Sequence, residues 1–198
     1  MLKPQDILVA LKLVALGREK WTYASLAESL GLSVSETHAA VKRGLESRLL
    51  TKLEWDGQKA ERPLPALIHI ERLIVDGLPY IMPTPLSARK VCMGMPTADG
   101  VSPLDDEFFK ASPGYLPPVW PVRGGQMKGW ALAPIYRTCP FAAKGDTRLY
   151  ALLTLADGMR VLQARVREAA KRIFKERIEE CRERLRAWRL ADAMEHTA

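Results

Sequence analysis

Side chains that could carry out chemistry are few and scattered in this chain of 198 residues. The potential metal ligands and thiols are His38, His69, His196, Cys92, Cys139 and Cys181. They include neither a Cys-x-x-Cys pair nor a Cys/His cluster, so the sequence predicts no metal site and no redox motif. Cysteines so widely spaced fit free thiols in a reducing cytoplasm.

The only dense acidic cluster is Asp105-Asp106-Glu107. Adjacent carboxylates can bind a cation, but in a proline-flanked stretch we favour a solvated surface or a helix start. Arg123-Gly124-Gly125 is too short to cradle a phosphate, and no Gly-x-Ser-x-Gly or P-loop signature occurs. We therefore expect a protein that is not an enzyme and that needs no cofactor.

The net charge of +7 favours nucleic acid as a partner, but the charge is unevenly placed. Residues 1–60 hold nine Lys/Arg and seven Asp/Glu, whereas residues 159–198 hold eleven and seven. Bulk charge therefore does not single out the N-terminal region. No stretch is apolar enough to cross a membrane, and the N-terminus lacks a secretory pattern, so we expect a cytoplasmic protein.

Proline divides the chain into three zones. Residues 79–140 hold eleven of the fourteen prolines, whereas residues 146–192 hold none and a single glycine, Gly158. We expect three parts: a helical head (1–62), a helix followed by a proline-rich small sheet (63–145), and a long C-terminal helix (146–198). The predicted fold class is α+β, mostly α.

Local signals in the head predict three helices. An amphipathic helix over residues 4–16 has Pro4 near its start, and Thr22 is a side-chain cap for a second helix that ends at Gly31. Ser33 and Glu36 have the spacing of a capping box, which begins a third helix that runs to about Ser47. The second and third helices are therefore joined by a very short turn.

The third helix has two distinct faces. Its predicted buried stripe is Thr37, Ala40, Val41, Gly44 and Leu45. At about 100° per residue, the opposite face is small and polar near the helix start and basic further on, which suits an approach to base edges and phosphates. After this helix, Asp56-Gly57 separates two strand-like runs and predicts a hairpin.

The run from Ser25 to Arg43, SLAESLGLSVSETHAAVKR, resembles the winged helix-turn-helix of the MarR and IclR regulator groups. Gly44 departs from the pattern because a large apolar residue is usual there, which should weaken the packing of the third helix. The resemblance implies a DNA-binding head with the hairpin as its wing. The register predicts these DNA-contacting residues: Thr22, Ser25, Ser33, Ser35, Glu36, Ala39, Lys42, Arg43, Lys52 and Lys59.

Beyond the head, Leu64–Gly77 reads as a fourth helix stopped by Gly77. Strand-like runs at 80–82, 91–93, 119–122 and 130–133 predict a small irregular antiparallel sheet, with a hairpin across residues 123–125. The final helix, capped by Asp146, carries a heptad-like apolar seam. Either it bends back near Gly158 or its distal half pairs with a second copy. The predicted dimer residues are Leu162, Val166, Ile173, Phe174, Ile178, Leu185 and Trp188.

The sequence thus predicts a sequence-specific, double-stranded DNA-binding transcription regulator. We favour a homodimeric repressor on a palindromic operator, because two-fold protein symmetry matches two half-sites. The alternative is a protein-binding antitoxin or adaptor, whose proline-rich middle captures a protein partner.

Overall fold

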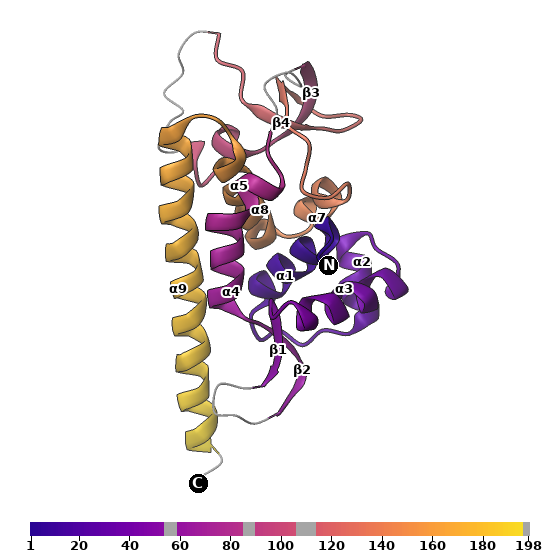
Figure 1. The fold of residues 1–198 in the computed structure, drawn as a ribbon, viewed down its shortest axis with the longest axis vertical. Coiled ribbons are helices and arrows are strands. Elements are labelled where there is room, and N and C mark those ends of the chain that lie inside the picture. The colour runs from indigo at the N-terminus through magenta and orange to yellow at the C-terminus, as the bar shows by residue number, and fades with distance from the viewer. Residues whose placement is uncertain (54–58, 85–89, 106–113, 196–198) are drawn as a thin grey trace.

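The computed structural model describes residues 1–53, 59–84, 90–105 and 114–195. Its N-terminal part is built from the helices α1 (Pro4–Leu16), α2 (Tyr23–Leu30) and α3 (Val34–Glu46). Helix α1 is apolar along almost its whole length, and every residue from Ile7 to Ala15 is buried. It lies in the middle of the molecule and contacts both α3 and the C-terminal helix α8 (Thr147–Arg160) (Figure 1).

A two-stranded antiparallel hairpin follows α3, as predicted. It consists of β1 (Leu50–Leu53) and β2 (Lys59–Pro65), with Leu50 paired to Pro65 and Thr51 to Leu64. The predicted turn at Asp56-Gly57 lies outside the described residues. Strand β2 is longer than expected and crosses the boundary predicted after residue 62.

The predicted fourth helix is wrong at both ends. Leu64 and Pro65 belong to β2, and the helix begins with α4 (Leu67–Arg72). It then continues through a π-helical turn (Leu73–Gly77) into α5 (Leu78–Ile81). Gly77 keeps right-handed helical angles, so it does not end the helix. The strand expected at residues 80–82 is not formed, because Tyr80 and Ile81 belong to α5 and Met82 follows its end.

A three-stranded closed barrel forms the end of the molecule opposite the hairpin (Figure 1). Its strands are β3 (Val91–Pro96), β4 (Pro118–Pro121) and β5 (Met127–Ala131). The hairpin predicted across residues 123–125 is wrong, because β4 and β5 each pair antiparallel with β3 and parallel with one another. Glycines 94, 125 and 129 face neighbouring backbone so closely that a Cβ atom would not fit, which explains how so small a barrel can close.

The C-terminal helix is two helices. After α7 (Cys139–Lys144), the Asp146 carboxylate accepts the Leu149 N–H and caps α8 as predicted, but α8 ends at Arg160. The chain then turns and returns as α9 (Ala164–Glu195), a long helix that packs on α8 and α4 (Figure 1). The break comes after Gly158, whose missing side chain leaves room for Ala170 of α9, since a Cβ there would lie 2.9 Å from that of Ala170.

A buried polar cluster joins α8 to the barrel. The Asp157 carboxylate accepts hydrogen bonds from the Thr97 hydroxyl (2.8 Å) and the Trp120 indole N–H (2.6 Å), and it pairs with Arg160 at 2.5 Å. Arg160 also donates to the carbonyl oxygens of Met82 and Ala133. Both charged side chains are almost fully buried, so each depends on the other and on these hydrogen bonds.

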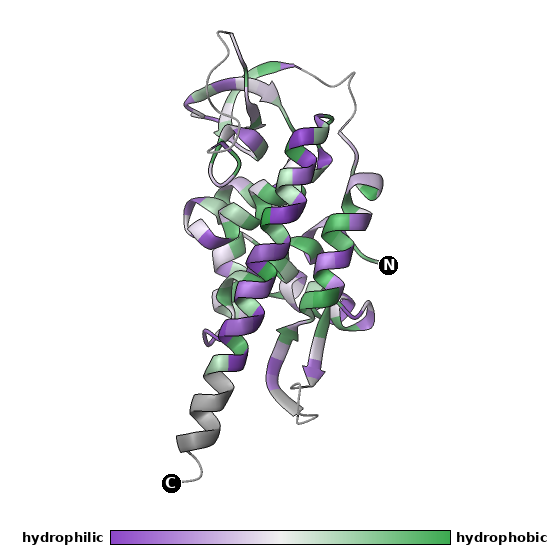
Figure 2. Ribbon diagram, turned by 90° about the vertical axis from the view of Figure 1, so that its left-hand side faces the viewer, coloured by the Kyte–Doolittle hydropathy of each residue, from purple (hydrophilic) through white to green (hydrophobic). Residues whose placement is uncertain are grey.

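The fold is therefore mostly helical, with a small antiparallel sheet and a long C-terminal helix, as the predicted fold class states. The outward face of α9 is largely hydrophilic along its described length, whereas its inward face packs on the core (Figure 2). None of the described helices combines the length and apolar character needed to cross a lipid bilayer.

Candidate nucleic-acid interface

The turn between α2 and α3 is set by Gly31, which adopts a left-handed conformation (φ 62°). Its N–H donates to the carbonyl oxygens of Ala27 and Glu28, which closes the end of α2. After Leu32, the Ser33 hydroxyl accepts the Glu36 N–H and begins α3. The short predicted connection and both predicted caps are confirmed, and together they fix the direction in which α3 leaves α2.

Helix α3 buries the stripe that its sequence predicts. Thr37, Ala40, Val41 and Gly44 are buried, and Leu45 is half-buried. Packing at Gly44 is close rather than weak, because the Leu50 side chain fills the space and would lie 2.8 Å from an added Cβ. The departure from the family pattern at this position is thus compensated by a residue of β1.

The opposite face of α3 is open to solvent. Ser35, His38 and Lys42 are exposed, and Ala39 is half-buried between them. His38 stacks on Tyr23 of α2 with a centroid distance of 3.5 Å, which fixes one edge of this face. Glu46, near the end of the helix, is exposed on the same side. We call the exposed Ser35, His38 and Lys42, together with the half-buried Ala39, the α3 face.

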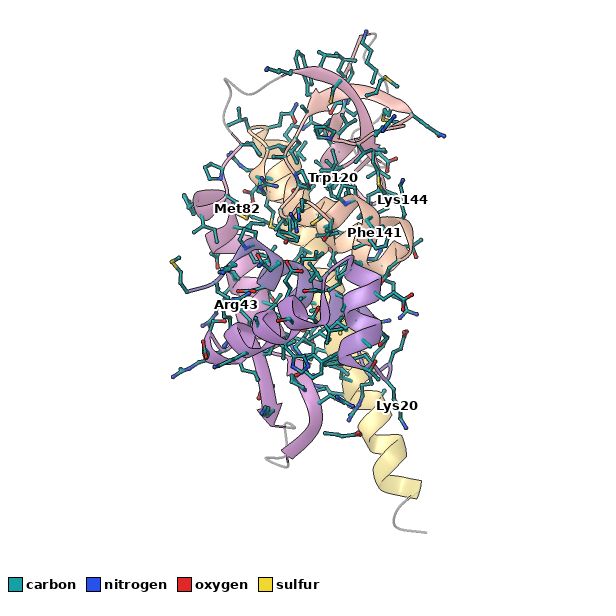
Figure 3. The ribbon with its side chains drawn as sticks, turned by 90° about the vertical axis from the view of Figure 1, so that its right-hand side faces the viewer. Lys20, Arg43, Met82, Trp120, Phe141 and Lys144 are labelled. Carbon is teal, nitrogen blue, oxygen red and sulfur yellow. The ribbon has the colours of Figure 1, made fainter. Side chains whose placement is uncertain are left out.

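Arg43 does not belong to this open face, contrary to the prediction that pairs it with Lys42. Its guanidinium donates twice to the Asp6 carboxylate, from Nε at 2.8 Å and Nη2 at 2.6 Å. Asp6 is completely buried and only 18% of the Arg43 side chain is exposed. This pair raises the pKa of Arg43, which is labelled in Figure 3, and anchors α3 to the start of α1. Arg43 is therefore a positioning residue.

The predicted contacts at the helix starts are exposed, but they also cap their own helices. Thr22 and Ser25 exchange hydrogen bonds between backbone N–H groups and side-chain oxygens, at 2.9 and 3.1 Å. The Ser33 N–H and hydroxyl donate to Glu36, and with Arg137 they lower the pKa of that carboxyl. Glu36 is therefore an anion at the edge of the α3 face.

A groove of about 630 Å³ borders the start of α2, between the loop after α1 and strand β2. It brings Thr22 and Ser25 together with cations that the sequence analysis did not select: Arg18, Lys20 and Arg62. The Arg62 guanidinium lies 5.9 Å from the Trp21 ring centroid, a cation–π contact. Of the two acidic side chains in the groove, Glu19 forms an ion pair with Arg148 at 2.8 Å.

The only sequence signal for this groove was the basic loop that precedes the Thr22 cap. Two cations in a loop are a common surface feature, so this loop alone does not predict a binding site. Arg62 lies about forty residues further along the chain, and the sequence gives no sign that it joins them. Lys52 of β1 is exposed, as its predicted role requires. The side chain of Lys59 lies outside the described part of the structure.

The residues predicted to form a dimer seam are largely used inside the chain. Val166, Phe174 and Ile178 are buried within the protomer, and so is Ile173. They cannot meet a second copy in this fold, because α9 folds back on α8, which is the other alternative that the sequence left open. Leu162 is 42% exposed and Leu185 is half-buried, whereas the side chain of Trp188 lies outside the described residues.

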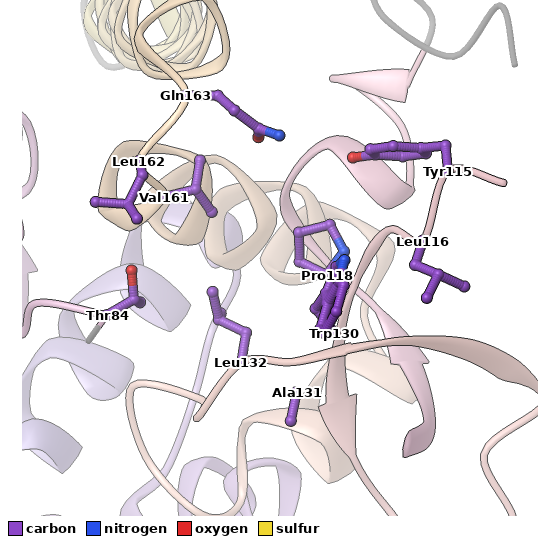
Figure 4. Close-up of a pocket in the computed structure, with 10 residues that line it drawn as sticks. All are labelled: Thr84, Tyr115, Leu116, Pro118, Trp130, Ala131, Leu132, Val161, Leu162 and Gln163. Atoms are coloured by element: carbon purple, nitrogen blue, oxygen red, sulfur yellow. The ribbon is translucent and has the colours of Figure 1, made fainter. Parts of the chain in front are cut away.

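A smaller cavity of about 90 Å³ lies at the corner between α8 and α9, against the barrel (Figure 4). Its walls are mainly apolar, with Leu132, Val161 and Trp130 among them. The hydroxyl of Thr84 donates to the Arg160 carbonyl oxygen, so this polar group already has an internal partner. Tyr115 and Gln163 also line the cavity, and the Tyr115 hydroxyl donates to the Asp99 carboxylate.

Within the described residues, no three His, Cys, Asp or Glu side chains lie close enough together to hold a metal ion. The thiols of Cys139 and Cys181 are buried, and burial raises the pKa of Cys139 to about 12. A thiol with so high a pKa is a poor nucleophile at neutral pH. Asp105 is half-buried, and the rest of the acidic cluster, Asp106 and Glu107, lies outside the described residues.

Comparison of the chain with protein-family models, curated proteins and solved structures gives no match. The α3 face and the neighbouring groove are the features of the molecule that bear on its function.

Proposed function

We propose that residues 1–65 form a winged helix-turn-helix that binds double-stranded DNA, with α3 as its recognition helix. The observation that carries the proposal is the α3 face, which stays open to solvent. The neighbouring side of α3 is anchored to α1 through Arg43 and Asp6. A helix held rigidly by one side and open on the other is what insertion into a groove requires.

The dimensions and chemistry of this face suit the major groove. That groove is about 12 Å wide and accepts one α-helix with its side chains. Small residues, Ser35 and Ala39, allow close approach near the helix start, and Lys42 lies one turn further along. Seryl and short apolar side chains can contact base edges, whereas a lysine reaches phosphate or guanine oxygen.

The groove at the start of α2 supports the same proposal. Arg18, Lys20 and Arg62 gather beside the exposed Thr22 and Ser25. Phosphate contacts of this kind position a protein on the duplex without reading its sequence. We propose that this groove binds one DNA strand while the α3 face enters the major groove.

A cytoplasmic transcription regulator, and in particular a repressor, is the function that we infer from such a module. A homodimer on a palindromic operator remains part of the proposal. Its interface, however, must use exposed surface, such as the region around Leu162, because Phe174 and Ile178 are buried within the protomer. The spacing of the two α3 faces would then match half-sites about one helical turn apart.

A protein-binding antitoxin or adaptor is the second candidate, and one observation favours it. Val91 and Trp130 are cross-strand partners on β3 and β5, and both are exposed together with Met93. Neighbouring exposed apolar side chains of this kind occur at protein interfaces. This surface lies at the opposite end of the molecule from the hairpin, so a protein partner there and DNA on α3 do not exclude one another (Figure 1).

Fluorescence anisotropy with a labelled duplex of mixed sequence tests the proposal. Lys42→Ala should weaken binding by about fivefold, and it should make the salt dependence shallower by about one ion if Lys42 meets a phosphate. Lys128→Ala on the exposed face of β5 removes the same charge from the barrel and is the matched control. Equal effects of the two substitutions, or no binding by the unchanged protein, would contradict the proposal.

A further inference from the structure

The segment that connects the barrel to α8 packs directly on the α2–α3 turn. The ring of Phe141, in α7, lies over Gly31, where an added Cβ atom would be 2.9 Å from the ring carbon Cδ1. Helix α7 also contacts α2. Residues from the C-terminal half of the chain are therefore placed beside the start of α3, where the proposed interface begins.

Arg137 is an exposed cation beside the start of α3. Its side chain is 78% exposed, and its Nη2 lies 4.0 Å from Glu36 Oε1. The guanidinium also lies 5.6 Å from the ring centroid of the adjacent Tyr136, which limits the directions it can take. An exposed ion pair at this distance contributes little to folding stability, so the contact with Glu36 alone gives Arg137 no large structural role.

The negative charge of Glu36 at this edge of the α3 face must be balanced by a cation when DNA approaches. Glu36 is an anion whose pKa is lowered by the Ser33 N–H and hydroxyl and by Arg137, so it stays charged at neutral pH and repels phosphate. Glu36 must nevertheless remain, because it caps α3 through Ser33. An arginine can satisfy the carboxylate with one edge of its guanidinium and bind a phosphate with another.

We propose that Arg137 binds a DNA backbone phosphate beside the start of α3, so that the C-terminal half of the chain supplies part of the DNA interface. This inference rests on the proposed DNA-binding function and adds a contact outside the winged helix-turn-helix itself. It gives the packing of α7 on the α2–α3 turn a purpose, which is to hold a cation at the edge of the recognition helix.

The test measures the affinity of the full chain for a labelled mixed-sequence duplex over a range of salt concentrations. Arg137→Ala should weaken binding by about fivefold at low salt and reduce the slope of log affinity against log salt by about one. Arg123→Ala, which removes an exposed arginine from the loop after β4, is the matched control and should change neither value. Urea unfolding of both variants should follow the unchanged protein.

A second background separates direct contact from simple neutralisation of Glu36. Glutamine keeps the capping box, so Glu36→Gln preserves α3 while removing the anion. If Arg137 binds phosphate, Arg137→Ala still weakens binding about fivefold in the Glu36→Gln protein. Loss of the effect in that background overturns the inference, and so does an equal effect of Arg123→Ala.

The two proposals fail differently. A protein whose affinity falls with Lys42→Ala but not with Arg137→Ala keeps the proposed function and overturns only the inference. A protein with no measurable affinity for any duplex overturns the proposed function, and with it the role assigned to Arg137.

Discussion

The N-terminal helices and the barrel at the other end of the molecule are held together in different ways. In residues 1–65, the starts of α2 and α3 are fixed by contacts between neighbours in sequence, Thr22 with Ser25 and Ser33 with Glu36, and one longer-range pair, Arg43 with Asp6, anchors α3 to α1. In the barrel, the decisive contacts join distant segments, as when Asp157 of α8 binds Thr97 and Trp120. Local contacts define where helices begin and end, whereas distant ones define how separate elements pack.

This difference suggests a division of labour. The N-terminal region presents an open polar face on a helix whose start is capped, and this face is the basis of the proposed DNA-binding function. The barrel and α8 share a buried ion pair, with donors around Asp157 and carbonyl acceptors around Arg160, so they are suited to hold the parts of the chain together. Substitutions in the two regions should therefore affect stability and DNA binding in different proportions.

The largest loss of unfolding free energy is expected for a substitution in the buried Asp157–Arg160 cluster. Asp157→Ala leaves the buried Arg160 guanidinium without its counter-ion, which should lower the free energy of unfolding by about 4 kcal/mol. Urea denaturation followed by circular dichroism measures the change. Asp76→Ala removes an exposed carboxylate from the helix before α5 and should change stability by less than about 0.5 kcal/mol. Similar losses for the two variants would mean that the cluster is not a structural centre.

A somewhat smaller loss of unfolding free energy is expected when the Arg43–Asp6 pair that anchors α3 is broken. Arg43→Ala leaves the buried Asp6 carboxylate without its partner and should cost about 3 kcal/mol in unfolding free energy. Lys42→Ala, one residue earlier and exposed, should cost less than about 0.5 kcal/mol while weakening DNA binding. Combined thermal-melt and anisotropy data for the two variants separate positioning from contact. The distinction fails if Arg43→Ala melts like the unchanged protein.

The smallest loss of stability is expected for a substitution in the turn between α2 and α3. Gly31→Ala places a Cβ on a left-handed residue and against the Phe141 ring, at a cost of about 1–2 kcal/mol in stability. The ring is exposed and can turn aside, so most of this cost is backbone strain. Gly145→Ala is the matched control, because its φ of −94° is right-handed and the space around it is open. A loss confined to Gly145→Ala would contradict this account of the turn.

Sequence reasoning worked best where structure depends on neighbours. The caps at Thr22, Ser33 and Asp146 and the buried stripe of α3 were predictable, because a side-chain cap or a helical period acts within a few residues. The tail shows the limit of this approach. Its apolar seam was recognised, but the period of a helix cannot tell whether α8 of the same chain or a second copy covers it.

The errors share a physical cause. Arg43 was placed with Lys42 because both lie outside the predicted buried stripe of α3, and only the fold reveals Asp6, which lies 37 residues earlier. The hairpin at residues 123–125 was predicted from a turn-like sequence, but β3 offers both flanking strands a better partner. Arg137 and the groove cations also escaped notice, because their neighbours come from distant parts of the chain.

The central claim is that DNA lies against the α3 face and the groove at the start of α2. Hydrogen–deuterium exchange of backbone amides, measured with and without a saturating duplex, locates the bound surface directly. The account predicts slower exchange in residues 17–25 and 33–42 when DNA is present, with residues 91–96 and 127–131 of the barrel unchanged. Slower exchange confined to the barrel, with residues 33–42 unaffected, would contradict it.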